Sequence, residues 1–194
     1  MSTTPAASAR EISINGESSL LKSTVLAVLL ACANTAAAQT NRSVYTPIGD
    51  KQCRTIKSHE AGDDGFEARC RGTAGYNLIL SEGDLRQNIT VITPKGAKHS
   101  LDLWDVISGG FSSVGPKAEW RLKASLPVAL ILRYNANEDP EKPEKQTSYL
   151  AVTKITATEI CVTDKISPGP TANEDARRAA DASITKPCLK TGNP

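Results

Sequence analysis

Three arginines, Arg54, Arg69 and Arg71, are the clearest candidates for binding chemistry in this sequence of 194 residues. If the two short segments that carry them pair as an antiparallel hairpin, Arg54 lies opposite Arg69, and Arg71 lies on the same face. Like charges in opposite positions repel each other unless an anion lies nearby. Glu67, diagonal to Arg54, can supply that anion within the chain, and otherwise a phosphate or carboxylate ligand can. The pattern therefore predicts either an internal ion pair or a surface that binds a small anion.

Trp120 is the second candidate binding residue. An exposed tryptophan marks a binding surface. The alternative is that Trp104 and Trp120, the two tryptophans of the chain, anchor the core with their indole N–H groups paired.

The sequence contains no recognisable catalytic or cofactor-binding motif. The patterns GxSxG, GxGxxG, GxxxxGK[ST] and HExxH are absent. His59 and His99 are isolated and no CxxC occurs, so we predict no catalytic residues, no metal site and no cofactor. A periplasmic hydrolase would need two carboxylates facing each other across a cleft. It remains the alternative, and its candidate residues are Glu82, Asp84, Asp102, Asp105 and Glu119.

The cysteines predict two disulfides. Cys32 lies in an apolar N-terminal segment, which leaves four: Cys53, Cys70, Cys161 and Cys188. An even number in an exported chain indicates a disulfide framework. Pairing Cys53 with Cys70 across the arginine hairpin separates a mostly apolar face from a mostly charged one, and a slip of one residue destroys that separation. By elimination, Cys161 then pairs with Cys188.

Residues 1–38 have the parts of an N-terminal extension with a signal peptide. Lys22 precedes the short apolar stretch Val25–Ala33, and an alanine run follows that ends at Ala38. Nine apolar residues are far fewer than the roughly 20 that span a bilayer, so we predict no transmembrane span, cleavage after Ala38, and a periplasmic or secreted location. Lipid attachment at Cys32, as in a bacterial lipoprotein, is the alternative.

The mature chain has the composition of one small domain that does not bind nucleic acid. The net charge of +2 is too small for a general polyanion binder, and the aromatic content of the full sequence, 4%, is too low for a base-stacking platform. We expect a loose start over 39–44, one disulfide-stapled domain over 45–190 and a tail over 191–194.

Short alternating apolar runs between Gly, Pro, Asn and Asp predict a mainly β (α+β) fold. The expected antiparallel sheet is curled into a sandwich or barrel, with one C-terminal α-helix packed on it. The candidate strands are Cys53–Lys57, Phe66–Arg71, Tyr76–Ser81, Arg86–Thr93, Ser100–Val106, Ala118–Lys123, Val128–Tyr134, Ser148–Ile155 and Glu159–Asp164.

The C-terminal helix is predicted by its ends and by one small-residue face. Thr171 and Glu174 have the spacing of a capping box, and Pro187 cannot continue a helix. Ala172, Ala176, Ala179, Ala180 and Ser183 share one face, with Ile184 beside it, so we expect this helix to pack on the sheet.

Three segments resemble a group of small exported proteins of Gram-negative bacteria to which no activity is assigned. They are Cys70–Tyr76, Glu82–Arg86 and Gly115–Arg121, and the resemblance covers about Tyr45 to Leu189. It implies an exported single domain and carries over no catalytic or binding residue. We therefore expect an exported, non-enzymatic binding or envelope-associated domain whose partner is an unknown protein or a small anionic ligand. A lipid-anchored structural protein of the envelope is a further alternative.

Overall fold

The computed structural model of the protein describes residues 41–49, 51–58, 65–139, 141–142 and 144–192. The chain divides after residue 38 into two units, and all described residues belong to the second. The predicted signal segment, Cys32 and the end of the predicted tail therefore lie outside the described residues. No helix in the described ranges is long and apolar enough to cross a membrane.

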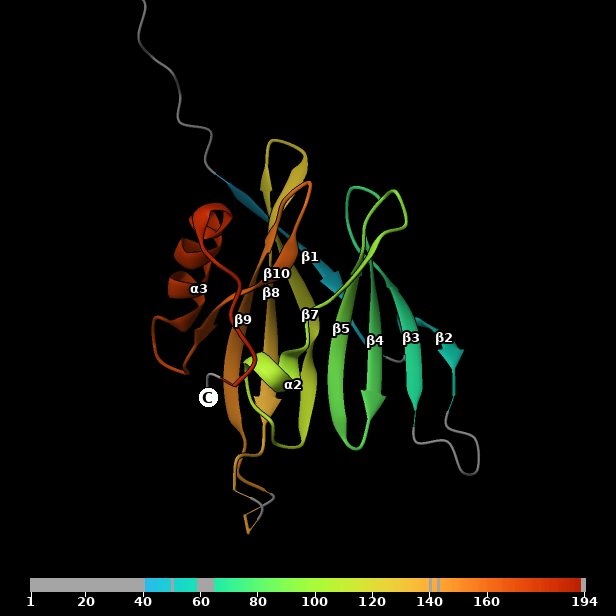
Figure 1. Ribbon diagram of the computed structural model, residues 1–194, viewed down its shortest axis with the longest axis vertical. Helices are drawn as coiled ribbons and strands as arrows, with labels where there is room; N and C mark the ends of the chain where they lie inside the picture. The colour runs from blue at the N-terminus through green and yellow to red at the C-terminus, as the bar shows by residue number, and fades with distance from the viewer. Residues whose placement is uncertain (1–40, 50, 59–64, 140, 143, 193–194) are drawn as a thin grey trace, which may run out of the picture. The chain divides into compact units, whose positions relative to one another are not determined.

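The described chain is mainly β with one main helix near its C-terminus, as predicted (Figure 1). Its strands are β1 (Arg42–Pro47), β2 (Arg54–Lys57), β3 (Phe66–Arg71), β4 (Asn77–Gly83), β5 (Arg86–Ile92), β6 (Lys98–Ser100), β7 (Ser112–Lys123), β8 (Leu126–Ala136), β9 (Thr147–Ile155) and β10 (Ile160–Ile166). Its helices are α2 (Leu103–Val106), α3 (Ala172–Asp181) and the 3-10 turn η1 (Ser183–Thr185).

The sheet is open and mixed, where the sequence predicted an antiparallel one. Its order is β10-β9-β8-β7-β5-β4-β3-β2, with β1 paired to β7 and β6 paired to β5. The link between β5 and β7 is parallel and consists of Arg86 opposite Ser112. Beyond this point β5 pairs with β6 and β7 pairs with β1. The sheet therefore splits into a first half (β2 to β6) and a second half (β1 and β7 to β10).

The two halves share one apolar core between their inner faces. Trp120 and Leu132 of the second half belong to the same buried cluster as Leu78 and Val91 of the first. Alternation along each strand produces this arrangement, since successive side chains point to opposite faces. Ile89 and Val91 of β5, and Leu130 and Leu132 of β8, alternate with other residues in this way and are all fully buried. A second, smaller cluster lies on the outer face of the second half, under α3.

Both predicted disulfides are confirmed, one in each half. Cys53–Cys70 joins the residue before β2 to β3, and Cys161–Cys188 joins β10 to the segment after α3. The hairpin register is as predicted at Arg54 opposite Arg69. It then shifts, so that Lys57 faces Glu67 and not Phe66. A β-bulge of this kind adds one residue to one strand and locally displaces the pairing.

The predicted strand Ser100–Val106 is wrong. β6 ends at Ser100, and Leu103–Val106 forms the single turn α2. The backbone of Asp102 is left-handed, with φ of 48°, which breaks the extended chain. The amide of Leu103 then donates to Oδ1 of Asn88 at 3.0 Å, so a side chain of β5 holds the turn in place.

Strand β1 was not predicted. The expected loose start covered residues 39–44, but Arg42 already pairs with Leu122 of β7. β1 pairs with the edge of β7 beyond the split, and its partner residues there lie some 80 residues away in sequence. A local sequence pattern therefore cannot reveal this strand.

Helix α3 packs through the small-residue face that the sequence predicts. Ala176 and Ala180 are buried against the second half, and Ser183 is buried just beyond the helix end. The predicted capping box is not formed: the Thr171 hydroxyl donates to the Asp175 carboxylate at 2.8 Å and caps no amide. The helix also ends at Asp181, well before Pro187.

Candidate functional site

The outer face of the first half brings three arginines together, as the hairpin pairing predicts. Arg54 lies directly opposite Arg69, and Arg71 follows two residues along β3. The side chains of all three are exposed, and none of the three guanidinium groups forms a hydrogen bond or ion pair with another described residue. Glu67 lies opposite Lys57 and makes no ion pair with Arg54. The internal ion pair that the sequence allowed is therefore not formed.

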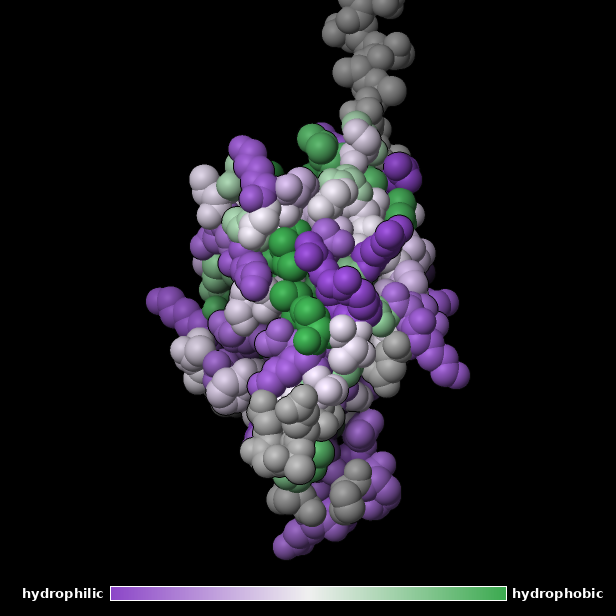
Figure 2. Space-filling model, turned by 90° about the vertical axis from the view of Figure 1, so that its right-hand side faces the viewer, coloured by the Kyte–Doolittle hydropathy of each residue, from purple (hydrophilic) through white to green (hydrophobic). Residues whose placement is uncertain are grey.

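Pairing across the strands shows what surrounds these arginines. Arg69 lies opposite Ile79 of β4. Across the sheet from Arg71, the residues in opposite positions are Asn77 of β4, Ile92 of β5 and finally Lys98 of β6. Lys98 adds a fourth exposed cation to the same face. Within the described ranges no helix packs on this face. Figure 2, which views the molecule from the β2 side, shows strongly hydrophilic side chains gathered on both sides of a narrow hydrophobic strip. We call Arg54, Arg69 and Arg71 the arginine face.

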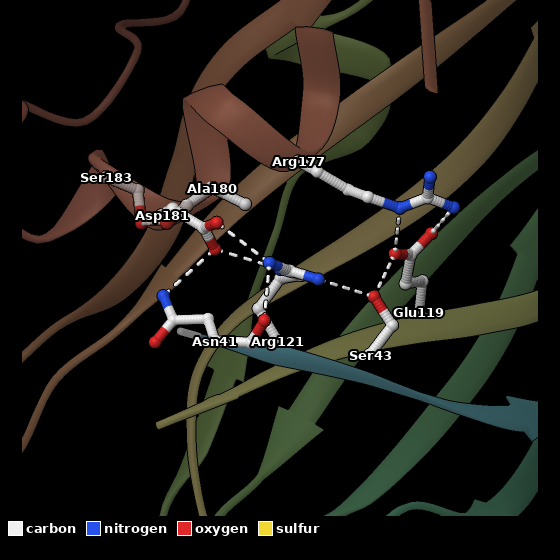
Figure 3. Close-up of polar contacts among 8 residues, drawn as sticks. All are labelled: Asn41, Ser43, Glu119, Arg121, Arg177, Ala180, Asp181 and Ser183. Carbon is white, nitrogen blue, oxygen red and sulfur yellow. Dashed lines mark hydrogen bonds and ion pairs between the residues drawn. The ribbon is translucent and has the colours of Figure 1, made fainter. Parts of the chain in front are cut away.

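Two other arginines lie on the outer face of the second half, and both are paired (Figure 3). The guanidinium of Arg121 donates from two nitrogens to the two carboxylate oxygens of Asp181 on α3, both at 2.8 Å. Arg177 of α3 donates to Glu119 of β7 at 2.6 Å. Ser43 of β1 joins the two pairs, because it accepts from Arg121 and donates to Glu119. We call these five residues the α3 network.

The α3 network lowers the pKa of both of its carboxyl groups. Burial by itself raises the pKa of Glu119, but hydrogen bonds from Arg177, Ser43 and Tyr45 outweigh it, and the pKa is lowered. Burial likewise opposes ionisation of Asp181, and the hydrogen bonds from Arg121 outweigh it. Because Arg121 and Glu119 are nearly buried, these charges hold the helix on the sheet and are not available to a ligand.

The two tryptophans lie in different environments, and only Trp104 departs from the core-anchor interpretation. Trp120 is fully buried, and its indole N–H donates to Oγ1 of Thr46 at 2.8 Å. It is therefore a core anchor with its N–H group paired, as the alternative interpretation predicts, and its side chain is not exposed to a partner. Trp104 was expected in the core but is 46% exposed.

Trp104 lies in a groove that sequence reasoning missed. Three adjoining hollows of about 780, 360 and 360 Å³ surround the side chain of Arg86 at the end of the sheet where β5 meets β7. We call them together the aromatic groove, lined mainly by Arg86, Trp104, Asp105, Phe111, Glu138 and Lys165. The one feature of the local sequence that could have indicated this groove is the Gly109-Gly110 pair before Phe111.

The five carboxylates considered for hydrolysis lie in three different places. Glu82, Asp84 and Asp105 line parts of the aromatic groove. Asp102 accepts from the Ser100 hydroxyl at 2.6 Å, and Glu119 belongs to the α3 network. Asp84 is ion-paired with Arg86. Three of the five carboxylates therefore lie in the groove, and Asp102 and Glu119 are not among its lining residues.

Glu159, Cys161 and Cys188 also lie together. Both cysteines are in a disulfide, and Glu159 is ion-paired with Lys154 at 2.5 Å. The group therefore has no free thiolate to offer a metal.

Comparisons with protein-family models, with curated protein sequences and with solved structures found no significant match. The resemblance to small exported proteins therefore stays a prediction.

Proposed function

We propose that this chain is an exported, non-enzymatic binding domain of the periplasm or the secreted fraction, and that its arginine face binds a small ligand with several anionic groups. The observation that carries the proposal is that three adjacent arginines are exposed and unpaired on a sheet face that no described helix covers.

Export is supported by the two disulfides, which are consistent with an oxidising compartment outside the cytoplasm. The signal-like segment before residue 39 supports the same conclusion from the sequence. N-terminal sequencing of the exported protein tests this step. We expect a terminus at Gln39, whereas a lipid-modified Cys32 at the terminus would support the lipid-anchored alternative instead.

The spacing of the arginines suggests the kind of anion. Side chains in opposite positions lie about 5 Å apart at Cβ, and two residues along one strand cover about 7 Å. A ligand with two or more phosphate or carboxylate groups can therefore contact several guanidinium groups at once, and each contact is a charge-assisted hydrogen bond. Citrate and inositol hexakisphosphate meet this requirement, and monovalent anions do not.

A second explanation of the arginines is that they only protect an edge. β2 is an edge strand, and charged side chains on such strands hinder pairing with other chains. Under that explanation no anion would bind preferentially.

Thermal unfolding in the presence of citrate or inositol hexakisphosphate separates the two explanations. A ligand that binds the folded state alone raises the melting temperature with the logarithm of its concentration. We expect this rise in the unmodified chain, its loss in Arg69→Gln, and its reduction by inert salt.

Arg42→Gln is the matched control, since it removes an exposed arginine from the second half. This variant should keep the response to the ligand. If the unmodified chain shows no rise, or if both variants lose the response equally, the arginine face is not a specific anion site.

A further inference from the structure

The aromatic groove presents two half-exposed aromatic rings on the same end of the fold. Trp104 is 46% exposed and Phe111 is 47% exposed. Large aromatic side chains usually bury most of their surface in a domain of this size. Here the core is poor in aromatics, with two Trp and two Phe in the whole chain, yet one of each is left at the surface around Arg86.

The exposure of Trp104 is imposed by α2. Leu103 is fully buried, and Val106 and Ile107 are nearly so. In one helical turn these three positions occupy the core-facing side, and Trp104 then points away from the core. Because Asn88 fixes the start of the turn through the Leu103 amide, Trp104 is presented on a rigid support.

Phe111 is held in position by its backbone and by Arg86. The Phe111 carbonyl accepts from the Asn137 amide at 2.8 Å. A side chain at Gly110 would come within 1.8 Å of the Asn137 carbonyl oxygen, so the loop can pack here only with glycine. The Arg86 guanidinium lies 5.2 Å from the centre of the Phe111 ring and donates to the Gly109 carbonyl at 2.9 Å.

The charged groups that line the groove have both signs. Arg86 and Lys165 are cationic, and Asp105 and Glu138 are anionic. Lys165 lies 4.3 Å from the centre of the Tyr149 ring, and the Tyr149 hydroxyl donates to Glu138 at 2.8 Å. Asp84 and Glu82 in the adjoining hollow add negative charge. A polyanion is therefore disfavoured, in contrast to the arginine face.

A ligand rich in hydroxyl groups fits such a lining best. Each hydroxyl can donate to a carboxylate and accept from a guanidinium or ammonium group. The faces of sugar rings carry C–H groups that stack on the negatively charged face of an aromatic ring. The three hollows adjoin each other through Arg86, and Trp104 lines two of them, which suits several sugar residues in a row.

We propose that the aromatic groove is a binding site for a neutral oligosaccharide, with Trp104 and Phe111 as stacking platforms and Arg86, Asp105 and Glu138 as hydroxyl partners. This site is separate from the arginine face and does not depend on the proposed anion ligand.

Tryptophan fluorescence tests the proposal directly, because the chain has one exposed tryptophan and one that is fully buried. Acrylamide should quench Trp104 and spare Trp120. The probes are the hexamers of N-acetylglucosamine, of α-1,4-linked glucose and of β-1,4-linked glucose, together with an array of neutral glycans. We expect at least one neutral glycan to protect Trp104 from acrylamide in a saturable way.

Substitutions then assign the site. Trp104→Ala should weaken binding, measured by calorimetry, by roughly tenfold or more. Phe111→Ala should weaken it as well, and Trp104→Phe should keep part of the affinity because a stacking face remains. Leu126→Ala, which shortens an exposed apolar side chain at the opposite end of β8, should bind as the unmodified chain does. Melting temperatures of the four variants show that each is folded.

Several results would overturn the proposal. One is that no neutral glycan protects Trp104 from acrylamide, and another is that only spermine or polygalacturonate protects it. The third is that both Trp104→Ala and Phe111→Ala bind the glycan with unchanged affinity. Arg69→Gln should bind the neutral glycan normally, so failure of the anion proposal and failure of this one can be told apart.

Discussion

Two groups of arginines, one on the outer face of each half, differ in whether they are paired. On the second half, Arg121 and Arg177 are each paired with a carboxylate of another element, and α3 covers the sheet beside them. On the first half, Arg54 and Arg69 face each other with no carboxylate partner among the described residues. Like charges in that position cost stability.

This difference separates arginines that hold the fold from arginines that are free to bind. A nearly buried guanidinium must be paired, because an unpaired buried charge is strongly destabilising. An exposed guanidinium keeps its hydration and its hydrogen-bond donors. On the covered face, burial of Arg121 and Glu119 accounts for the pairing of Arg121 and Arg177. On the uncovered face, the exposed Arg54 and Arg69 are explained either by an external anion or by a role in edge protection.

The largest expected effect comes from the disulfide of each half. Removing Cys53–Cys70, which spans 17 residues, should cost about 3 kcal/mol, and removing Cys161–Cys188, which spans 27, about 3.5 kcal/mol. Only the second bridge holds the segment after α3 against β10. Hydrogen exchange of the α3 amides should therefore rise in Cys161→Ser/Cys188→Ser and stay unchanged in Cys53→Ser/Cys70→Ser. Equal exchange in the two variants would contradict a separate attachment of the covering helix.

The next largest effect on stability is expected from replacing one arginine on each face. Arg121→Ala leaves Asp181 without its bidentate partner and should lower the free energy of unfolding by about 2–3 kcal/mol, less than for a fully buried pair because Asp181 is partly exposed. Arg69→Ala should leave stability unchanged or raise it slightly, since the repulsion with Arg54 is gone. Urea denaturation of both variants measures the contrast. A comparable loss in Arg69→Ala would mean that the first-half arginines also hold the fold.

A third prediction concerns acid. Glu119 and Asp181 have pKa values that are lower in the folded chain than in the unfolded one. The unfolded state therefore binds protons first as the pH falls. The stabilisation is fully present above the ordinary carboxyl pKa of about 4 and is lost as the pH falls through the lowered values. Stability curves between pH 6 and pH 2.5 should be flatter in Glu119→Gln than in the unmodified chain. Glu67→Gln, on the uncovered face, is the control and should keep the steep curve.

The smallest effect is expected at Thr171. A true capping threonine typically contributes about 1 kcal/mol, but the Thr171 hydroxyl donates to Asp175 and accepts from no amide. Thr171→Ala should therefore cost well under that amount, and exchange of the amides from Ala172 to Ala176 should hardly change. A loss near the full capping value would show that the hydroxyl caps the helix in solution.

The local sequence pattern determined much of the strand pairing and helix packing of this protein. The segregation of charged and apolar side chains around Cys53 and Cys70 was enough to find their pairing and the opposition of Arg54 and Arg69, because alternation along a strand depends only on the chain itself. The small-residue face of α3 was readable for the same reason. The alternation of Ala118, Trp120 and Leu122 with charged neighbours also carried a signal for the burial of Trp120.

Tertiary structure alone decided which charges are paired and which rings are exposed. Glu119 and Arg121 alternate like solvent-facing residues, and they are nearly buried only because α3 and β1 pack over them from distant parts of the chain. Trp104 became exposed because Asn88 of β5 holds a helical turn where the apolar pattern favoured a strand. A side chain's face can be read from its neighbours in sequence, but what lies against that face is set by elements far along the chain.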